Sequence, residues 1–269
     1  MVCSKEVAPK AVSKVMLGVT AGLLVSSPIT NYIASETSIE MAMLFFAIVN
    51  AMAFIATLLF VPSMPVKEGL SYGTQLSVLK KPITWLAIAT VVFIGSSQSS
   101  INSYIAEYLE TTTNISGKSL SLVLFLLGLA SLVGNLVGGK LLTKNAVKTV
   151  TSYPIVLAIV YVLSFLTGKS TLPMILTVLT WGMLFAIGGM INQFWITSAA
   201  PEAPDFANGL FLSFGNLGIT FGTAVGRLFI SGMGTQYIVL GGLLFLLLSL
   251  VSILLRNYIY SSIKQQLAS

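Results

Sequence analysis

The stretch "TSAAPEAPDFANGLFLSFGNLGITFGTAVG", residues Thr197 to Gly226, contains a short polar turn followed by a long apolar run. The turn carries two prolines, a glutamate and an aspartate, and the run carries Gly218, Gly222 and Gly226 at intervals of four residues. Residues four apart share one face of a helix, and small residues there let two helix backbones approach closely in lipid. The stretch therefore predicts an elbow between two membrane helices, the second of which packs through its glycines.

The composition extends this prediction to the whole chain. Of its 269 residues, 55% are hydrophobic and 8% are charged, whereas soluble domains carry about 25% charged residues. Apolar runs of about 20 residues, separated by short polar loops, are typical of membrane-spanning helices. We expect eight, at residues 14–34, 40–61, 83–106, 119–142, 148–167, 171–198, 206–232 and 236–256. The sequence thus predicts an all-α polytopic membrane protein with about eight transmembrane helices.

The basic residues are distributed unequally between the two sides of the membrane. Eight crossings place both termini on one side, together with Lys5, Lys10, Lys14, Lys67, Lys80, Lys81, Lys140, Lys144, Lys148, Arg256 and Lys264. Lys118 and Lys169 fall on the opposite side, and Arg227 falls within the seventh run. Because an excess of lysine and arginine marks the cytoplasmic side, we expect a multi-pass protein of the cell membrane with both termini and the elbow in the cytoplasm. The net positive charge therefore reports topology and does not indicate a nucleic-acid partner.

The chain lacks the residue clusters that membrane enzymes use. It has no histidine, Cys3 is its single cysteine, Asp205 is its single aspartate, and the glutamates lie in or near expected loops. A membrane hydrolase or prenyltransferase needs titratable groups or metal ligands that converge within the membrane. We therefore expect no enzymatic activity, no catalytic residue, no metal site and no cofactor.

Neutral polar side chains remain as candidates for a binding site. The third run changes from "WLAIATVVFI" to "GSSQSSINSY", and the sixth run carries a second polar group near its cytoplasmic end. Amides in hydrocarbon need a hydrogen-bond partner or water, so these residues either bond between helices or line a cavity. We favour a substrate cavity for Gln98, Ser99, Asn102, Tyr104, Asn192 and Gln193.

Other residues are assigned packing roles. Gly134 and Gly138 repeat the four-residue spacing in the fourth run, so the helix-packing candidates are Gly134, Gly138, Gly218, Gly222 and Gly226. Asn135 and Asn216 lie beside these glycines, and we expect them to form interhelical hydrogen bonds. Trp195 is expected to be an interfacial anchor and not a residue that stacks on a ligand.

Two stretches carry a resemblance to a known family. The first, "SYIAEYLETTTNISGKSLSLVLFLLGLASLVGNLVGGKLLTK" at residues 103–144, has Gly134-Asn135 and Gly138-Gly139 before a basic residue. The second is the elbow with its glycine run. In their order and spacing they resemble the major facilitator superfamily, above all the arabinose-efflux-permease-like branch of the drug:proton antiporters. The resemblance runs nearly end to end and matches helices five to twelve of the family's twelve.

The resemblance implies a partial major-facilitator fold. Residues 1–62 would be a two-helix remnant of the N-terminal half, 63–81 a cytoplasmic linker and 82–269 a six-helix C-terminal transmembrane bundle. The implied function is proton-driven efflux of a small solute (drug, sugar or nucleobase class) by an N-terminally truncated form. The implied partners are membrane lipid, a small-molecule substrate and, in a full-length form, protons. The alternative is a non-transporting remnant or partner subunit that lacks the first four helices.

Two departures from the family bear on these expectations. Arg227 stands where a glycine is usual, and Thr143 stands where an aspartate is usual. In addition, the expected spanning runs supply no carboxylate at depth. Proton coupling needs a titratable group between the two compartments, because a carboxylate in a loop equilibrates with one of them only. We therefore expect that the 269-residue chain does not perform proton-coupled export alone.

Overall fold

The computed structural model describes residues 18, 22, 29, 30, 33, 37–61 and 72–266. The described residues form helices joined by turns and contain no strand. Contacts divide the chain into two compact units, Met1–Leu70 and Ser71–Ser269. The described residues contain one long apolar helix in the first unit and several in the second, which confirms the all-α polytopic class that the composition predicted.

Six helices within the described residues are long and apolar enough to cross a membrane. They are α2 (Ile39–Phe60) in the first unit, and α4 (Pro82–Asn102), α6 (Gly117–Thr167), α7 (Thr171–Thr197), α8 (Pro204–Met233) and α9 (Ile238–Gln266) in the second. Because α6 holds two of the expected runs, these helices account for seven of the eight expected runs. The first expected run, 14–34, lies outside the described residues except for five single positions.

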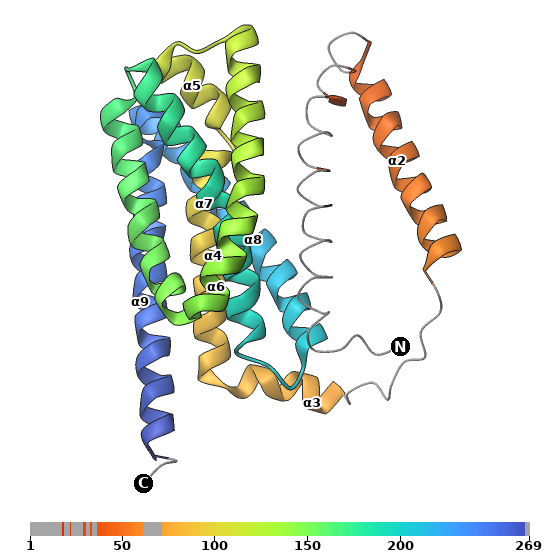
Figure 1. Cartoon of the computed structure of the whole chain (residues 1–269), viewed down its shortest axis with the longest axis vertical. Coiled ribbons are helices and arrows are strands. Elements are labelled where there is room, and N and C mark those ends of the chain that lie inside the picture. Colours follow the sequence, from red (N-terminus) through yellow and green to blue (C-terminus); the bar gives the residue numbers. More distant parts are fainter. Residues whose placement is uncertain are drawn as a thin grey trace. The chain divides into compact units, whose positions relative to one another are not determined.

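Helix α6 consists of two arms that meet at Asn145. This residue has a non-helical backbone, with φ −160° and ψ 91°, and the chain reverses direction there (Figure 1). The Asn145 side-chain oxygen accepts a hydrogen bond of 3.0 Å from the backbone N–H of Lys148. This is the role of an N-cap, which satisfies a free donor in the first turn of a helix. Asn145 therefore begins the second arm, 146–167, beside the first, 117–144.

Helix α4 is shorter than the expected run 83–106. It ends at Asn102, and α5 (Ile105–Thr113) begins after a turn at Ser103 and Tyr104. The Tyr104 backbone, with φ −122° and ψ 17°, is not helical, and its hydroxyl donates a 3.0 Å hydrogen bond to the carbonyl oxygen of Thr223 in α8. The single expected run is thus corrected to two helices, and the turn between them is held by α8.

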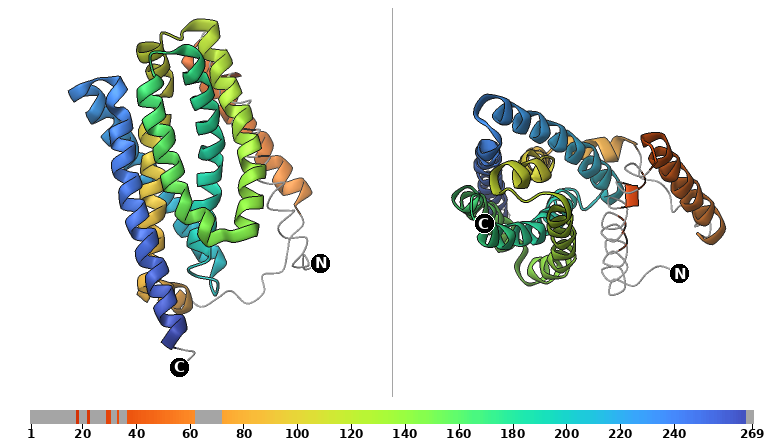
Figure 2. Two further views of the ribbon diagram at one scale, coloured as in Figure 1. Left: turned by 60° about the vertical axis from the view of Figure 1, so that its left-hand side comes forward. Right: turned by 90° about the horizontal axis from the view of Figure 1, so that it is seen from above.

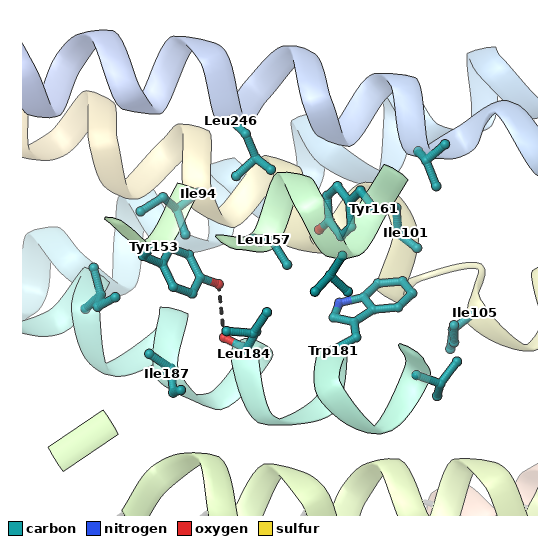
Figure 3. Packing of buried hydrophobic residues seen from close by; sticks show 14 of the residues in the cluster. Ile94, Ile101, Ile105, Tyr153, Leu157, Tyr161, Trp181, Leu184, Ile187 and Leu246 are labelled. Carbon is teal, nitrogen blue, oxygen red and sulfur yellow. Dashed lines mark hydrogen bonds between the residues drawn. The ribbon is translucent and has the colours of Figure 1, made fainter. Parts of the chain in front are cut away.

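Helix α4 lies at the centre of the second unit. It packs against α7, α8 and α9, while α6 packs against α7 and α9; Figure 2 shows these helices from the side and from above. Buried side chains from five helices (α4, α5, α6, α7 and α9) form one cluster that includes Tyr161 and Trp181, whose rings pack edge to face with centroids 5.7 Å apart (Figure 3). A central helix has neighbours on all sides, which explains why few residues of α4 are exposed.

The expected linker 63–81 is partly helical. Residues Tyr72–Ser77 form α3 and Val78–Lys80 form the 3₁₀ helix η1, and both belong to the second unit. Val78 is fully buried in a small cluster with Ala200, Ala203 and Ala207, at the elbow between α7 and α8. The Nζ atom of Lys81 lies 2.5 Å from the Oε1 atom of Glu202 in the same elbow. The start of α4 and the elbow therefore meet at one end of the bundle.

We call this end of the second unit the Lys81 end, and the opposite end the Lys169 end. The Lys81 end also carries the last residues of α9 and the turn at Asn145 (lower part of Figure 1). The Lys169 end carries α5, the turn between α6 and α7, and the 3₁₀ helix η2 (Thr235–Tyr237).

The α8 glycines face α4 directly. A Cβ atom at Gly218 would lie 2.7 Å from the carbonyl oxygen of Val92, and one at Gly226 would lie 2.5 Å from that of Ser100. At Gly222 it would overlap the carbonyl oxygen of Ser96. The two backbones are therefore in contact along three helical turns, and no side chain larger than a hydrogen atom fits between them.

The α6 glycines face α7 in a similar way. A Cβ atom at Gly134 would overlap the backbone of Met183, and one at Gly138 would lie 3.2 Å from a side-chain carbon of Ile187. The first arm of α6 thus approaches α7 most closely at Gly134.

Candidate functional site

The polar half of α4 lies inside the bundle. The Gln98 side chain is 5% exposed, and its amide nitrogen donates to the hydroxyl of Tyr153 at 2.9 Å and to the carbonyl oxygen of Phe185 at 3.0 Å. Tyr153 in turn donates to the carbonyl oxygen of Leu184 at 3.0 Å (Figure 3). Gln98 therefore joins α4 to the second arm of α6 and to α7.

Backbone carbonyl oxygens at the centre of α7 accept hydrogen bonds from side chains of α4 and of both arms of α6. Besides the bonds to Leu184 and Phe185, the Ser131 hydroxyl of the first α6 arm donates to the carbonyl oxygen of Gly182 at 2.9 Å. Gly188 makes room for this network, because a Cβ atom there would overlap the Tyr153 hydroxyl and the Gln98 amide. The sequence interpretation missed Gly188, whose only signal was its position in the pair Gly188-Gly189.

The other cavity candidates in this part of the chain differ in burial and in their partners. Ser99 is buried, Asn102 is half-buried, and Tyr104 reaches α8 near the Lys169 end through its bond to Thr223.

Asn192 and Gln193 lie toward the Lys81 end of α7. Asn192 is 5% exposed, and its Oδ1 atom has no hydrogen-bond partner among the described residues. Gln193 is half-buried and donates to Asn208 of α8 at 3.4 Å. The structure thus places four of the six candidates in the second half of α4 and the turn after it, and two near the Lys81 end of α7. Their role as a substrate cavity stays a prediction.

A different set of polar residues is exposed along α8. We call it the α8 stripe: Ser213, Asn216, Thr220, Thr223 and Arg227. Successive members are three or four residues apart, so they share one face of the helix. Four of the five are exposed and Thr223 is half-buried. The sequence interpretation missed the stripe, although its spacing was visible beside the glycine spacing.

The side chains of the α8 stripe make few hydrogen bonds to other helices. The Asn216 amide donates to the carbonyl oxygen of Leu212 at 2.8 Å, and Thr220 donates to that of Asn216 at 3.0 Å, both within α8. The interhelical bond expected of Asn216 is therefore wrong. Thr223 is the exception, because its hydroxyl lies 2.9 Å from that of Ser103 in the α4–α5 turn.

A buried cation lies at the Lys81 end of α9. Arg256 is 6% exposed; its Nη1 donates to the carbonyl oxygen of Trp195 at 2.6 Å and its Nη2 to the hydroxyl of Ser198 at 2.9 Å. Its guanidinium carbon lies 3.8 Å from the Trp195 ring centroid. The indole is 4% exposed, so Trp195 packs beneath Arg256 inside the bundle and is not the interfacial anchor that we expected. Arg256 is thus, like Arg227, a charged residue within a spanning helix.

The carboxylates lie at the two ends of the second unit. Within its described residues, Glu202 and Asp205 are at the Lys81 end, and Glu107 and Glu110 are in α5 at the Lys169 end. The hydrogen bond from Lys81 lowers the pKa of Glu202 below its usual value, and a backbone hydrogen bond adds to this effect. No carboxylate of the described second unit lies midway along α4, α6, α7, α8 or α9.

Comparison with known proteins gives one family. A family model described as Major Facilitator Superfamily matches residues 2–222. AraJ of Escherichia coli (strain K12) is 24% identical over 277 residues, which cover 100% of this chain and 69% of that protein. A protein of Helicobacter pylori (strain 26695) named "Probable sugar efflux transporter" is 27% identical over 206 residues, 75% of this chain and 53% of that one.

A third relative carries a name of another kind. "Transcription regulatory protein OpdE" of Pseudomonas aeruginosa (strain PAO1) is 29% identical over 164 residues, 61% of this chain and 40% of that protein. The chain thus spans between 40% and 69% of the length of these three curated relatives.

Proposed function

Because this chain belongs to the major facilitator superfamily, we propose that it exports a small polar solute across the cell membrane by alternating access. The proposed driving force is the antiport of protons. The name of the Helicobacter relative refers to sugar efflux, and sugars are one of the three solute classes that we consider, beside drugs and nucleobases.

The observation that carries this proposal is the α8 stripe. Hydroxyl and amide groups on an exposed face of a spanning helix are unfavourable against lipid unless they are hydrated. Among the described residues, the side chains of four of the five stripe residues make no hydrogen bond to another helix. Leu217, Phe221 and Leu228 provide a separate apolar exposed side of α8. The stripe is therefore suited to face a water-filled pathway, where its donors and acceptors can bind a polar solute.

The proposed proton coupling depends on where the acidic residues lie. Coupling requires a group that titrates within the membrane and is reached from both sides in turn. The acids of the described second unit lie at its ends. A second candidate function, that of a partner subunit that does not transport alone, is favoured by this distribution.

The proposed orientation places the Lys81 end in the cytoplasm. It follows from the bias of lysine and arginine toward that side. The ion pair between Lys81 and Glu202 is compatible with it, since both residues were assigned to the cytoplasm from the sequence.

Reconstitution separates the two candidate functions. The 269-residue chain is placed in liposomes, a pH gradient is imposed, and the efflux of dyes, sugars and nucleobases is followed with and without a protonophore. Efflux that the protonophore abolishes supports proton-driven export by this chain. Solute-dependent thermal stabilisation without efflux supports the partner subunit. The absence of both would overturn both functions.

A further inference from the structure

Arg227 is a permanent positive charge on the exposed face of a spanning helix. The guanidinium stays protonated at every physiological pH. The residue is exposed, and it makes no hydrogen bond or ion pair with any residue that the structure describes. It is six residues before Met233, the last residue of α8, which corresponds to about 9 Å along the helix axis. The charge therefore lies inside the span, toward the Lys169 end, and has no counter-ion in the described part of the chain.

Gly226, the residue before Arg227, is one of the α8 glycines that lie directly against α4. A Cβ atom at Gly226 would lie 2.5 Å from the carbonyl oxygen of Ser100 and 3.1 Å from the ring of Tyr104. The α8 backbone next to Arg227 is therefore in close contact with the end of α4. Leu228, the next residue, is 70% exposed on the apolar side of α8, so the guanidinium belongs to the polar face.

Two hydroxyls lie one helical turn from Arg227. The Ser103 and Thr223 oxygens are 2.9 Å apart, and the bond from the Tyr104 hydroxyl to the Thr223 carbonyl holds this turn against α8. When one hydroxyl donates to the other, the second keeps its own hydrogen free to donate elsewhere. The pair can thus offer a directed donor next to a guanidinium, which itself presents a planar fork of N–H groups that suits carboxylate and phosphate.

We propose that Arg227, with the Ser103–Thr223 hydroxyl pair, forms an anion-binding subsite that selects solutes carrying a carboxylate or a phosphate. This inference rests on the transport function proposed above and narrows its solute class from polar molecules to anionic ones. The neutral stripe residues, Ser213, Asn216 and Thr220, would then contact the uncharged part of the same solute. The competing source of the same chemistry is the phosphate of a lipid headgroup at the Lys169 end.

The test measures ligand-induced thermal stabilisation of the whole 269-residue chain in nanodiscs of phosphatidylcholine. The probes are D-galacturonate and D-galactose, which differ by one carboxylate, together with acetate and inorganic phosphate at constant ionic strength. We expect at least one anion to stabilise the wild type and D-galactose to act more weakly than D-galacturonate. Arg227→Gln should weaken the anion response by about 10- to 100-fold, the usual effect of losing a hydrogen bond to a charged group. Arg227→Lys should retain part of it.

Lys118→Gln is the matched control. It removes one positive charge from an exposed residue at the Lys169 end, so a response to net charge alone would change equally in both variants. Equal anion responses of wild type and Arg227→Gln overturn the subsite, as does the absence of any anion response. Stabilisation by D-galactose that is as strong as that by D-galacturonate, with both responses unchanged in Arg227→Gln, also overturns the subsite but leaves the proposed transport function intact.

A second set of nanodiscs distinguishes the lipid source. Phosphatidylglycerol is added at about one third of the lipid. If this lipid stabilises the wild type but not Arg227→Gln while the soluble anions have no effect, Arg227 binds headgroups and the solute subsite is refuted. If soluble anions act equally in both lipid compositions, the subsite is supported.

Discussion

The interior of the second unit is held together by individual polar side chains as well as by apolar packing. The Gln98 amide nitrogen donates hydrogen bonds to two other helices, one to the Tyr153 hydroxyl and one to the Phe185 carbonyl oxygen. Such bonds form in a dry environment, where an unsatisfied donor or acceptor is destabilising. Each of these residues therefore restrains more than one helix.

Replacing Gln98 by leucine should lower the free energy of unfolding by about 1–3 kcal/mol, because the Tyr153 hydroxyl loses a donor within the core. Thermal unfolding in detergent measures the change. Tyr153→Phe should have a similar effect, and the double variant should lose less than the sum of the two. Additive losses would show that the two side chains act independently. Asn102→Leu is the control, because Asn102 is only half-buried.

Arg256 is a second residue whose burial carries a testable consequence. It donates to the carbonyl oxygen of Trp195 in the last turn of α7, where the negative end of the helix dipole favours a cation. Arg256→Met keeps the aliphatic stem and removes the charged donors, so we expect a loss of about 2 kcal/mol in unfolding free energy. Lys140→Met, at an exposed position, should leave the melting temperature nearly unchanged. Equal melting temperatures for both variants would refute this role of Arg256.

The residue scale is where sequence reasoning was least reliable. Gln98 and Asn216 are both amides in spanning runs, yet the structure buries Gln98 among three helices and exposes Asn216. A central helix has neighbours on every side, so the spacing of its polar residues does not reveal which face is wet. Arg256 was counted as a cytoplasmic charge because sequence cannot show that the last turn of α7 lies beside it.

Two pairs of helices, α8 with α4 and the first arm of α6 with α7, are in contact through their backbones at glycines. We call these two contacts seams. In the seam between α8 and α4, Gly222 lies against Ser96 so closely that a Cβ atom would overlap the carbonyl oxygen. Gly222→Leu should therefore force α8 away from α4 and cost about 1–3 kcal/mol or more. Leu217→Ala, on the exposed side of α8, should cost less than about 1 kcal/mol. Near-normal thermal stability of Gly222→Leu in detergent would contradict the seam.

The contact between the elbow and the start of α4 should depend on pH. The pKa of Glu202 is lowered mainly by the hydrogen bond from Lys81, so the stabilisation is fully present above the ordinary glutamate pKa and is lost as the pH falls through the lowered value. Both side chains are partly exposed, so the pair contributes about 0.2–1 kcal/mol. The difference in melting temperature between wild type and Glu202→Gln should be present at pH 7 and vanish in acid. A difference that persists at low pH would assign the effect to another contact.

The spanning helices could be predicted from the sequence because length and apolarity decide them. The ends of α7 and α8 lie within two residues of the expected runs 171–198 and 206–232. The break at Ser103 and Tyr104 could not be predicted, because it is held by a bond from Tyr104 to α8, which is distant in sequence. Tertiary contacts of this kind decide where an apolar run bends.

At the scale of the whole molecule, the orientation in the membrane is the property that the sequence predicts most directly. Single cysteines at Lys118 and Lys169 should react with an impermeant thiol reagent in intact cells, and a cysteine at Glu202 should not, in a Cys3→Ser background. All three positions are exposed, whereas Ile115 is 5% exposed and unsuited as a reporter. Labelling of the cysteine at position 202 from outside would contradict this orientation.

The burial of the polar half of α4 has a consequence for biosynthesis. The ribosome completes α4 before any of its partners exist: Tyr153 follows Gln98 by 55 residues, Phe185 by 87, and Gly218 follows Ser96 by 122. At about 5–20 residues per second, the last of these delays amounts to about 6–24 s. The mean hydropathy of α4 is 1.3, against 2.9 for the final helix, so α4 alone is a weak substrate for release into lipid. We therefore expect its stable insertion by the translocon to be completed only after α7 and α8 of the nascent chain have emerged.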